Sequence, residues 1–323
     1  MGMKAISLKP LKSQQQDLIS AFPDVEFKFT SGVGEIDEAD KASVDILFGY
    51  DGDLDEVFLA SCPELKWIAW FATGVNNPPL DYIENNGIRL TNGKGIHAKQ
   101  MAEFNIAYIL DDYKNMKTSH INQLNKVYDS KMTGTRLMGK TALILGTGEI
   151  ARRTAYLLHA FDVKVLGINT SGHDADEIDE AYKLDALTDV LPQADIVINT
   201  LPETEDTIHL LQRKHFEVMK DDALFINVGR GTVVEENVLV EVLKDKVIRQ
   251  AYLDVFENEP LTEDNPLYSL DNVVITAHIT GNGKENNQEA TDMFKRNLSH
   301  FLNKNELIEN EAVSYTHLRA HET

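Results

Sequence analysis

The sequence predicts an α/β protein with two doubly wound parallel sheets. Two stretches of the chain, residues 4–90 and 141–277, alternate between short apolar runs and amphipathic helical patterns. Such alternation is typical of parallel βα units. A glycine-rich turn joins the first apolar run of the second stretch to the helical pattern behind it. With 323 residues, the chain is long enough for two domains that each bury their own core.

The first alternation predicts a small open sheet. The apolar runs expected to form its strands are residues 5–8, 25–29, 44–48, 66–71 and 88–90, and the helical patterns lie near 13–21, 53–61 and 79–85. Two glycines, Gly93 and Gly95, then suggest a hinge. Residues 98–113 predict a helix with a wide apolar face, which should be largely buried between domains or subunits. That face consists of Met101, Phe104, Ile106, Ala107, Ile109 and Leu110.

The second alternation predicts a six-stranded sheet. A polar segment, residues 114–135, leads into it. The expected strands are residues 142–145, 163–168, 195–199, 223–228, 249–255 and 273–277, and the helical patterns are 149–161, 185–191, 213–219 and 235–244. A last helix over residues 285–303 should return to the first sheet, because its apolar face needs a partner.

The turn after the first strand of the second sheet carries a dinucleotide-binding pattern, Gly-x-Gly-x-x-Ala. Gly146 permits a tight turn, Gly148 lets the backbone approach a pyrophosphate, and the small Ala151 lets helix and strand pack closely. The free N–H groups at the start of the helix would face the phosphates. The predicted contacts are Gly146, Thr147, Gly148, Glu149 and Ile150. An ordinary βα turn with glycines is the alternative.

These patterns predict a Rossmann dinucleotide-binding domain inserted in a smaller flavodoxin-like domain. The substrate-binding (catalytic) domain is expected over residues 1–96 and 285–311, and the Rossmann domain over 97–284. Residues 312–323 differ in composition from what precedes them and resemble translated vector sequence. We therefore expect a non-native tail there and assign its two histidines no chemistry.

The charge of the chain limits its partners. The formal net charge is −21, which makes nucleic acid and anionic membrane unlikely ligands. No run of 18 apolar residues occurs, and the N-terminus lacks an apolar signal core. Cys62 is the only cysteine, which fits a reducing cytoplasm and predicts a buried structural thiol rather than a nucleophile. No residues show convincing zinc-ligand spacing.

Three strand ends of the second sheet carry residues suited to acid–base chemistry. Arg230 stands between Gly229 and Gly231, so its guanidinium should point into a cleft, where it can hold a carboxylate with two hydrogen bonds. Glu259 and His278 follow the next two strands on the same rim. Each alone would also fit a surface ion pair, a turn or a structural histidine. Together they predict reduction of a 2-oxo acid: Arg230 orients the carboxylate and polarises the carbonyl, His278 donates a proton, and Glu259 favours the imidazolium.

With these motifs, the chain resembles the D-isomer-specific 2-hydroxyacid dehydrogenase family over about residues 60–303. The motifs that carry the resemblance are Ala194-Asp195-Ile196-Val197, Leu201-Pro202 with Thr204 and Thr207, residues 227–231, 254–260 and 278–281, and in the first half Thr73-Gly74-Val75 and residues 95–104.

The resemblance implies further roles. Arg230, Glu259 and His278 match the catalytic set of the family, and the backbone of Thr73, Gly74 and Val75 matches its substrate-carboxylate loop. From the strand pattern alone, residues 71–77 could equally form a plain connection. The implied cofactor contacts are Leu201, Pro202 and Thr207 beside the adenosine ribose, and Asn227, Val228, Gly229 and Asp254 beside the nicotinamide. An active site between the domains, closure about a hinge and a homodimer are also implied.

The second strand departs from the family pattern where the cofactor ribose would lie. NAD-dependent members carry an acid there, which binds the ribose hydroxyls and repels a 2′-phosphate. This chain has Asn169, followed by Thr170 and Ser171. All three are predicted cofactor contacts. We therefore expect NAD or NADP, with NADP modestly favoured. Glu149 is a second departure, because an acid beside phosphate is unfavourable unless it points to solvent.

The expected activity is hydride transfer between a nicotinamide cofactor and a small 2-oxo or D-2-hydroxy acid. One alternative is a regulatory protein that senses a dinucleotide on the same scaffold, and another is a phosphonate or amino-acid dehydrogenase of related fold. His97 could touch substrate, whereas His209 and His215 are expected to face solvent or cap helices. The sequence does not name the acid, since pocket side chains come from loops.

Overall fold

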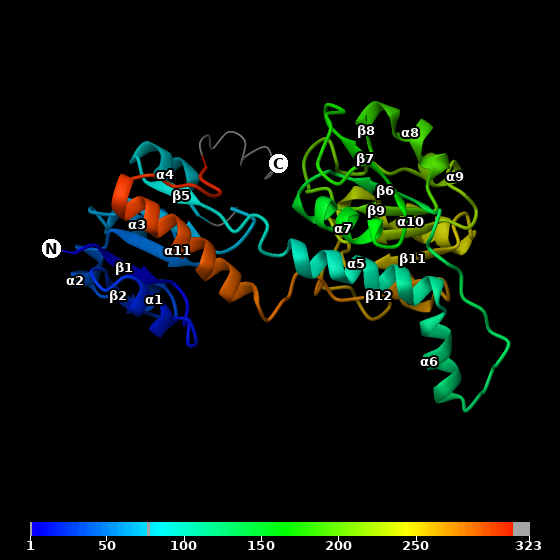
Figure 1. The fold of residues 1–323 in the computed structure, drawn as a ribbon, viewed down its shortest axis with the longest axis horizontal. Coiled ribbons are helices and arrows are strands. Elements are labelled where there is room, and N and C mark those ends of the chain that lie inside the picture. Colours follow the sequence, from blue (N-terminus) through cyan, green and yellow to red (C-terminus); the bar gives the residue numbers. More distant parts are fainter. Residues whose placement is uncertain (1, 76–77, 313–323) are drawn as a thin grey trace. The chain divides into compact units, whose positions relative to one another are not determined.

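The structure, a computed structural model, describes residues 2–75 and 78–312 (Figure 1). The chain divides into two compact units. Unit 1 comprises residues 1–96 and 284–323, and unit 2 comprises residues 97–283. Each unit contains one parallel sheet. The predicted fold class, two parallel-sheet α/β domains, is therefore confirmed.

Unit 1 is built on a five-stranded sheet in the order β2-β1-β3-β4-β5, which is the flavodoxin-like order. All five predicted strands are present. They are β1 (Lys4–Ser7), β2 (Glu26–Phe29), β3 (Ile46–Gly49), β4 (Trp67–Trp70) and β5 (Arg89–Thr91). The helices of unit 1 are α1 (Gln15–Ala21), α2 (Glu38–Lys41), α3 (Glu56–Ala60), α4 (Leu80–Asn85) and α11 (Asn286–Lys304), with a 3₁₀ turn, η1 (Val33–Glu35).

Helices cover both faces of the unit 1 sheet (Figure 1). On one face, α3 and α4 pack against β1, β3 and β4, and the buried Cys62 belongs to this core. On the other, α1 and α11 pack against the same strands. Phe294 of α11 is 1% exposed, and its ring stacks on Phe48 with centroids 4.4 Å apart. The last helix thus completes the core of the first sheet, as its apolar face predicted.

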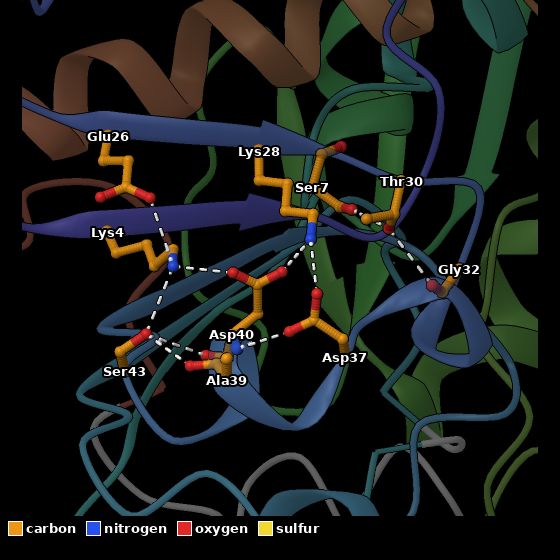
Figure 2. Close-up of polar contacts among 10 residues, drawn as sticks. All are labelled: Lys4, Ser7, Glu26, Lys28, Thr30, Gly32, Asp37, Ala39, Asp40 and Ser43. Carbon is orange, nitrogen blue, oxygen red and sulfur yellow. Dashed lines mark hydrogen bonds and ion pairs between the residues drawn. The ribbon is translucent and has the colours of Figure 1, made fainter.

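A buried carboxylate attaches the short helix α2, which the sequence did not predict, to the edge of this sheet (Figure 2). The Asp40 carboxylate forms ion pairs with the ammonium groups of Lys28 on β2 and Lys4 on β1. These two ion pairs hold the pKa of its carboxyl below the usual range. Asp37 caps α2 by accepting from the Asp40 N–H at 2.9 Å. The ion pairs neutralise the buried charge that Asp40 would otherwise carry.

Unit 2 is built on a seven-stranded sheet in the order β12-β11-β10-β9-β6-β7-β8. Counted from β6, this is the Rossmann order 3-2-1-4-5-6 with one further strand. The strands are β6 (Thr141–Leu145), β7 (Lys164–Asn169), β8 (Glu180–Lys183), β9 (Ile196–Asn199), β10 (Leu224–Asn227), β11 (Gln250–Leu253) and β12 (Val273–Ile275). The helices are α5 (Ala98–Tyr113), α6 (Met116–Leu124), α7 (Glu149–His159), α8 (Leu187–Val190), α9 (Arg213–Glu217) and α10 (Glu236–Lys244). The short 3₁₀ turns are η2 (Leu184–Ala186), η3 (Leu191–Gln193), η4 (Gly231–Val233) and η5 (Pro266–Ser269).

The two faces of this sheet have separate cores. α5 and α7 pack on one face around Ile144, Ile198 and Ile226, and α8, α9 and α10 pack on the other around Leu143, Val197 and Phe225. The alternation of β6, β9 and β10 residues between the two cores follows from the period of two in a strand. Both faces are apolar, as expected for a parallel sheet.

The structure corrects the sequence prediction at several places in unit 2. The sheet has seven strands rather than six, because β8 (Glu-Ala-Tyr-Lys) is a polar edge strand without an apolar run. The polar segment 114–135 contains the helix α6. On α5, the predicted face is only partly buried: Ala107 is exposed, whereas Tyr108 and Asn105 are buried.

Ala312, the first residue of the predicted tail, packs against unit 1, and the non-native origin of residues 312–323 stays a prediction. The Ala312 N–H donates to Leu90 O at 2.9 Å, and the Ala312 side chain packs against the core of unit 1. Residues 313–323, which make up the rest of the predicted tail, lie outside the described residues.

Candidate active site

The predicted site residues of unit 2 follow the carboxyl ends of six strands. Residues 146–150 follow β6, Asn169–Ser171 complete and follow β7, and residues 201–207 follow β9. The other three groups contain Arg230 after β10, Asp254 and Glu259 after β11, and His278 after β12. These ends meet at one edge of a parallel sheet, which is where open α/β sheets generally bind their ligands.

The structure brings His278 and Glu259 together. His278 Nδ1 lies 2.8 Å from Glu259 Oε2, and the two side chains are 52% and 34% exposed. The other oxygen, Oε1, accepts from the Phe256 N–H at 2.9 Å. With Nδ1 facing the carboxylate, Nε2 is the ring nitrogen left for a reacting group. The geometry is that of a histidine whose orientation is set by an acid.

A buried carboxylate holds the turn that carries His278. Asp254 is 0% exposed and accepts hydrogen bonds from Thr276 Oγ1 at 2.5 Å, Ile279 N at 2.9 Å, Thr280 N at 3.1 Å and Thr280 Oγ1 at 2.6 Å. The Asp254 carbonyl accepts from the His278 N–H at 2.8 Å. His278 has a φ of +52°, in the left-handed region that is unusual for a non-glycine residue. Asp254 therefore fixes a strained backbone at a candidate catalytic position.

Arg230 lies in a tight turn after β10. Its side chain is exposed, and its Nη1 donates to Gly229 O at 2.8 Å. The turn is closed by the buried Asn227, whose Oδ1 accepts from Gly229 N and whose Nδ2 donates to Arg230 O. Asn199 Nδ2 donates to the same Oδ1 at 2.9 Å. The predicted residues Asn227 and Gly229 thus shape the turn that presents Arg230.

The glycine turn has the features that a pyrophosphate needs. Gly146 has a φ of +90°, and a Cβ there would lie 3.0 Å from Thr200 Oγ1. Gly148 is the N-cap of α7, and a Cβ on it would meet no atom within 4 Å, so a ligand can approach the backbone. No side chain caps the helix. Glu149 pairs with Arg152 at 3.6 Å and is partly solvent-exposed. Its charge is therefore not buried beside the position expected for the phosphates.

Asn169 uses its whole side chain to fold the loop behind β7. Its Oδ1 accepts from Ser171 N at 3.2 Å and Gly172 N at 2.6 Å, and its Nδ2 donates to Thr147 Oγ1 at 3.2 Å and His173 O at 2.9 Å. Ser171 Oγ lies 2.7 Å from His173 Nδ1, and both residues are exposed, as is Thr170. The loop therefore presents hydroxyls and an imidazole at the end of β7.

The loop behind β9 is closed by Thr207. Its buried hydroxyl donates to Pro202 O at 2.7 Å and accepts from Thr204 N at 2.8 Å. Leu201 N donates to Asn199 Oδ1, which ties the loop to the Arg230 turn. These hydrogen bonds of Thr207 stabilise the loop that contains Leu201 and Pro202. Contact of Leu201, Pro202 and Thr207 with the cofactor stays a prediction.

The predicted substrate loop belongs to unit 1 and follows β4. The Trp70 indole N–H donates to Gly74 O at 2.9 Å, and Thr73 Oγ1 donates to Gly93 O at 3.2 Å. Thr73 and Gly74 are exposed, and Val75 is buried. Asn76 and Asn77 lie outside the described residues. Trp70 therefore supports the loop from the core, where it is 1% exposed.

Several residues of the edge were missed by sequence reasoning. Thr276 and Thr280 bind Asp254, and Tyr108 OH bonds Thr276 Oγ1 at 2.6 Å, with burial raising the pKa of Tyr108 to about 12. His209, expected to face solvent or cap a helix, is exposed and also pairs with Glu257 at 2.7 Å. His97, a suggested substrate contact, lies 2.9 Å from Gly281 O. In the sequence, Thr276 and Thr280 are marked only by their position just after β12, and Tyr108, within α5, carries no such signal.

Comparison with known proteins decides the family. The family model described as "D-isomer specific 2-hydroxyacid dehydrogenase, NAD binding domain" matches residues 106–280, which is more than half of the chain. The chain belongs to the D-isomer specific 2-hydroxyacid dehydrogenase family. The resemblance stated from the motifs is therefore confirmed.

Relatives of this dehydrogenase match over most of its length. Glyoxylate reductase from Thermofilum pendens is 33% identical over 251 residues, covering 76% of the chain and 74% of the relative. Glyoxylate reductase from Aeropyrum pernix is 30% identical over 300 residues, covering 88% of each. The crystal structure of a D-isomer specific 2-hydroxyacid dehydrogenase family protein from Aeromonas salmonicida subsp. salmonicida has a TM-score of 0.80 at 28% identity, covering 96% of this chain and 99% of that one.

Membership makes this dehydrogenase an NAD(P)-dependent oxidoreductase of 2-oxo and 2-hydroxy acids. Within the described residues, no helix is long and apolar enough to span a membrane. The same residues contain no group of three or more histidine, cysteine, aspartate or glutamate side chains arranged to hold a metal ion.

Proposed function

We propose that this dehydrogenase reduces a small 2-oxo acid to the D-2-hydroxy acid, and catalyses the reverse reaction, with His278, Glu259 and Arg230 as its catalytic residues. The observation that carries the proposal is the 2.8 Å contact between His278 and Glu259 beside the strand that presents Arg230. The names of its relatives make glyoxylate the first acid to test. We propose a cytoplasmic enzyme with no nucleic-acid or membrane partner, in line with the charge of −21.

His278 acts as the proton donor in reduction. Its Nδ1 faces Glu259, so Nε2 is the position that would give a proton to the carbonyl oxygen. The Glu259 carboxylate, at hydrogen-bond distance from Nδ1, fixes the orientation of the ring. In oxidation the neutral ring takes the proton back through the same atom.

Arg230 binds the substrate carboxylate and polarises the carbonyl. A guanidinium presents its donors as a planar fork that matches a carboxylate. We assign the backbone of Thr73, Gly74 and Val75 to binding of the substrate carboxylate, because this loop follows a parallel strand, where ligands bind. Residues 1–96 and 285–311, which contain the loop, would act as the substrate domain.

The cofactor fits the turn at residues 146–150. The φ of +90° at Gly146, the open approach at Gly148 and the uncapped start of α7 suit a pyrophosphate. When bound, the nicotinamide supplies or accepts the hydride. Leu201 and Pro202 would contact the adenosine side, while Val228, Gly229 and Asp254 would lie near the nicotinamide.

We propose that both NAD and NADP are used, with NADPH preferred about fivefold in kcat/KM. Asn169 carries no charge that would repel a 2′-phosphate, and Ser171 and His173 are exposed beside it. Asn169→Asp should reverse the preference toward NADH. The new carboxylate keeps the hydrogen bonds from Ser171 N and Gly172 N, although it loses the donation to His173 O. A strong wild-type preference for NADH would refute this reasoning.

A screen of 2-oxo acids with NADH and NADPH, followed at the nicotinamide absorbance, tests the function. His278→Gln should keep cofactor binding and lower kcat by about 100-fold or more, and near-normal turnover in this variant contradicts its role. Arg230→Lys should weaken 2-oxo acid binding while leaving cofactor affinity nearly unchanged. Cofactor binding without any turnover would instead favour a dinucleotide-sensing regulator, and turnover of phosphonates or amino acids a different dehydrogenase.

We also propose a homodimer formed through α6 and the segment that follows it. Leu124 is 83% exposed and Tyr128 is 95% exposed, and Met116, Ile121 and Val127 are exposed on the same stretch. Such a cluster of exposed apolar side chains is typical of an interaction surface. Light scattering on the wild type and on a Leu124→Glu/Tyr128→Glu variant tests the proposal, which predicts a dimer for the first and a monomer for the second.

A further inference from the structure

A second histidine–carboxylate pair lies on the same loop as the first. Glu257 and Glu259 are two residues apart after β11, and each contacts a histidine: His209 Nε2 lies 2.7 Å from Glu257 Oε1, and His278 Nδ1 lies 2.8 Å from Glu259 Oε2. Both histidines have a φ of +52°. The proposed reaction uses only the pair of Glu259 and His278, so the role of the other pair is open.

Glu257 connects its loop to the start of α10. Its second oxygen, Oε2, accepts from the Glu236 N–H at 2.9 Å, and Glu236 is the first residue of that helix. The residue at the N-cap of α10, Glu235, provides no side-chain cap. The hydrogen bonds from Glu236 N and from His209, in that order, lower the pKa of the Glu257 carboxyl against the effect of its burial. A negative charge at a helix start is favourable, so Glu257 serves as the cap of α10 from another loop.

His209 connects the same carboxylate to a third segment. Its backbone N–H donates to Thr232 O at 2.8 Å, in the turn that follows Arg230. Thr232 Oγ1 in turn donates to Glu203 Oε2 at 2.6 Å, on the loop that contains His209. His209 therefore contacts the loop behind β11 through its ring and the loop behind β10 through its backbone.

The two loops that His209 contacts also touch each other directly. A Cβ on Gly231 would lie 1.9 Å from the Phe256 carbonyl carbon and 2.4 Å from Glu257 N, so the chain beside Arg230 packs against the Phe256–Glu257 peptide. Phe256 N donates to Glu259 Oε1. If Glu257 moved, Phe256 would move with it, and its hydrogen bond to Glu259 would change. Gly231, which packs against the Phe256–Glu257 peptide, would also shift the neighbouring Arg230.

We propose that His209 and Glu257 are positioning residues, which clamp the loops carrying Arg230 and Glu259 and so keep Glu259 in register with His278. The proposal rests on the proposed function, because it assigns these two residues an effect on that reaction. The His209 side chain is 44% exposed and that of Glu257 is 24% exposed. Such a pair adds little to global stability, so its loss should change catalysis far more than folding.

The test uses variants that remove the contact between His209 and Glu257 while leaving the positive φ at residue 209 possible. Asn tolerates positive φ better than most residues, and its amide is too short to replace His209 Nε2, so His209→Asn keeps the turn and removes the contact. His209→Gln places a donor near the position of Nε2. Glu257→Ala removes both hydrogen bonds, and Glu257→Gln retains an acceptor for Glu236 N. His159→Asn is the matched control, because His159 also faces two acids, Asp179 and Glu177, at the far end of α7.

We expect His209→Asn and Glu257→Ala to lower kcat about 10-fold to 100-fold, with KM and cofactor affinity changed less than about threefold. The melting temperature should fall by less than about 4 °C. His209→Gln and Glu257→Gln should restore most of the rate, and His159→Asn should match the wild type.

Hydrogen exchange gives a measurement that needs no turnover. The amides of Phe256 and Glu236 should exchange faster in His209→Asn and Glu257→Ala than in His159→Asn. Glu257 accepts directly from the Glu236 N–H, and the proposed clamp positions Glu259, which accepts from the Phe256 N–H. Unchanged exchange, unchanged kcat, or a loss of activity that only tracks the loss of folded protein and is not rescued by the Gln variants would each overturn the proposal. If the wild type reduces no 2-oxo acid, the proposed function fails, and the exchange rates still decide whether the clamp exists.

Discussion

Replacing Asp254 with asparagine should loosen the turn that carries His278. Each Asp254 oxygen accepts one hydroxyl and one backbone N–H: Oδ1 from Thr276 Oγ1 and Ile279 N, and Oδ2 from Thr280 Oγ1 and Thr280 N. An amide nitrogen would face one of these N–H groups whichever way it flips. A hydroxyl can rotate to accept, but an N–H cannot, so one buried donor is left without a partner.

The expected cost follows from this count. An unsatisfied buried N–H costs about 1–3 kcal/mol, and the remaining hydrogen bonds lose their charged acceptor, so Asp254→Asn should lower the free energy of unfolding by about 2–4 kcal/mol. His278 at φ +52° then has less to hold it, and kcat should fall more than 10-fold. Urea denaturation and steady-state kinetics measure the two effects.

A control variant separates the scaffold role of Asp254 from direct cofactor contact. Thr276→Ser keeps the hydroxyl that bonds Asp254, and it should retain near-normal stability and rate. An Asp254→Asn protein with unchanged stability and at least tenfold weaker NADH or NADPH binding would refute the reasoning, because the carboxylate would then act on the cofactor rather than on the turn.

Three further measurements test other parts of the structure. Phe294→Ala should destabilise unit 1 by about 3–5 kcal/mol in urea denaturation, because Phe294 is buried against Phe48 and Trp67; a cost below about 1 kcal/mol would contradict that packing. Burial opposes ionisation of Asp195, but the Thr141 N–H and two lysines outweigh it and lower its pKa. Its stabilising effect is therefore present above the unfolded pKa of about 3.9 and lost as pH falls through the folded value, so Asp195→Asn should flatten the acid limb of a stability–pH curve. Tyr108→Phe removes the bond to Thr276, and it should also remove the loss of stability that a raised pKa of about 12 causes above about pH 10.

Local patterns in the sequence were sufficient to predict most strands. Leu143 to Leu145 and Ile196 to Ile198 are apolar on both faces, which a parallel sheet requires, so their runs stand out. β8 escaped prediction because it is a polar edge strand, and α6 because its exposed apolar residues lack a face toward the core. Both elements owe their structure to neighbours rather than to their own pattern.

The candidate site divides in the same way. His278, Glu259 and Arg230 could be predicted because strand ends meet at one edge, whatever the loops do. The partners of Asp254 could not, since which hydroxyls and N–H groups reach a buried carboxylate depends on the path of residues 276–280. His209 gave no signal for the same reason: it lies 48 positions from Glu257, and no period links the two.

The insertion of unit 2 into unit 1 determines the order in which the two cores can be completed during synthesis. Unit 2 is continuous, residues 97–283, whereas the core of unit 1 needs α11, which leaves the ribosome only after the whole of unit 2. At about 5–20 residues per second, the face of Phe48 and Trp67 that receives Phe294 and Phe301 stays uncovered for about 10–40 s after residue 97 is made. The nascent chain would therefore expose an apolar surface that the finished enzyme covers, and unit 2 can complete its core before unit 1 does.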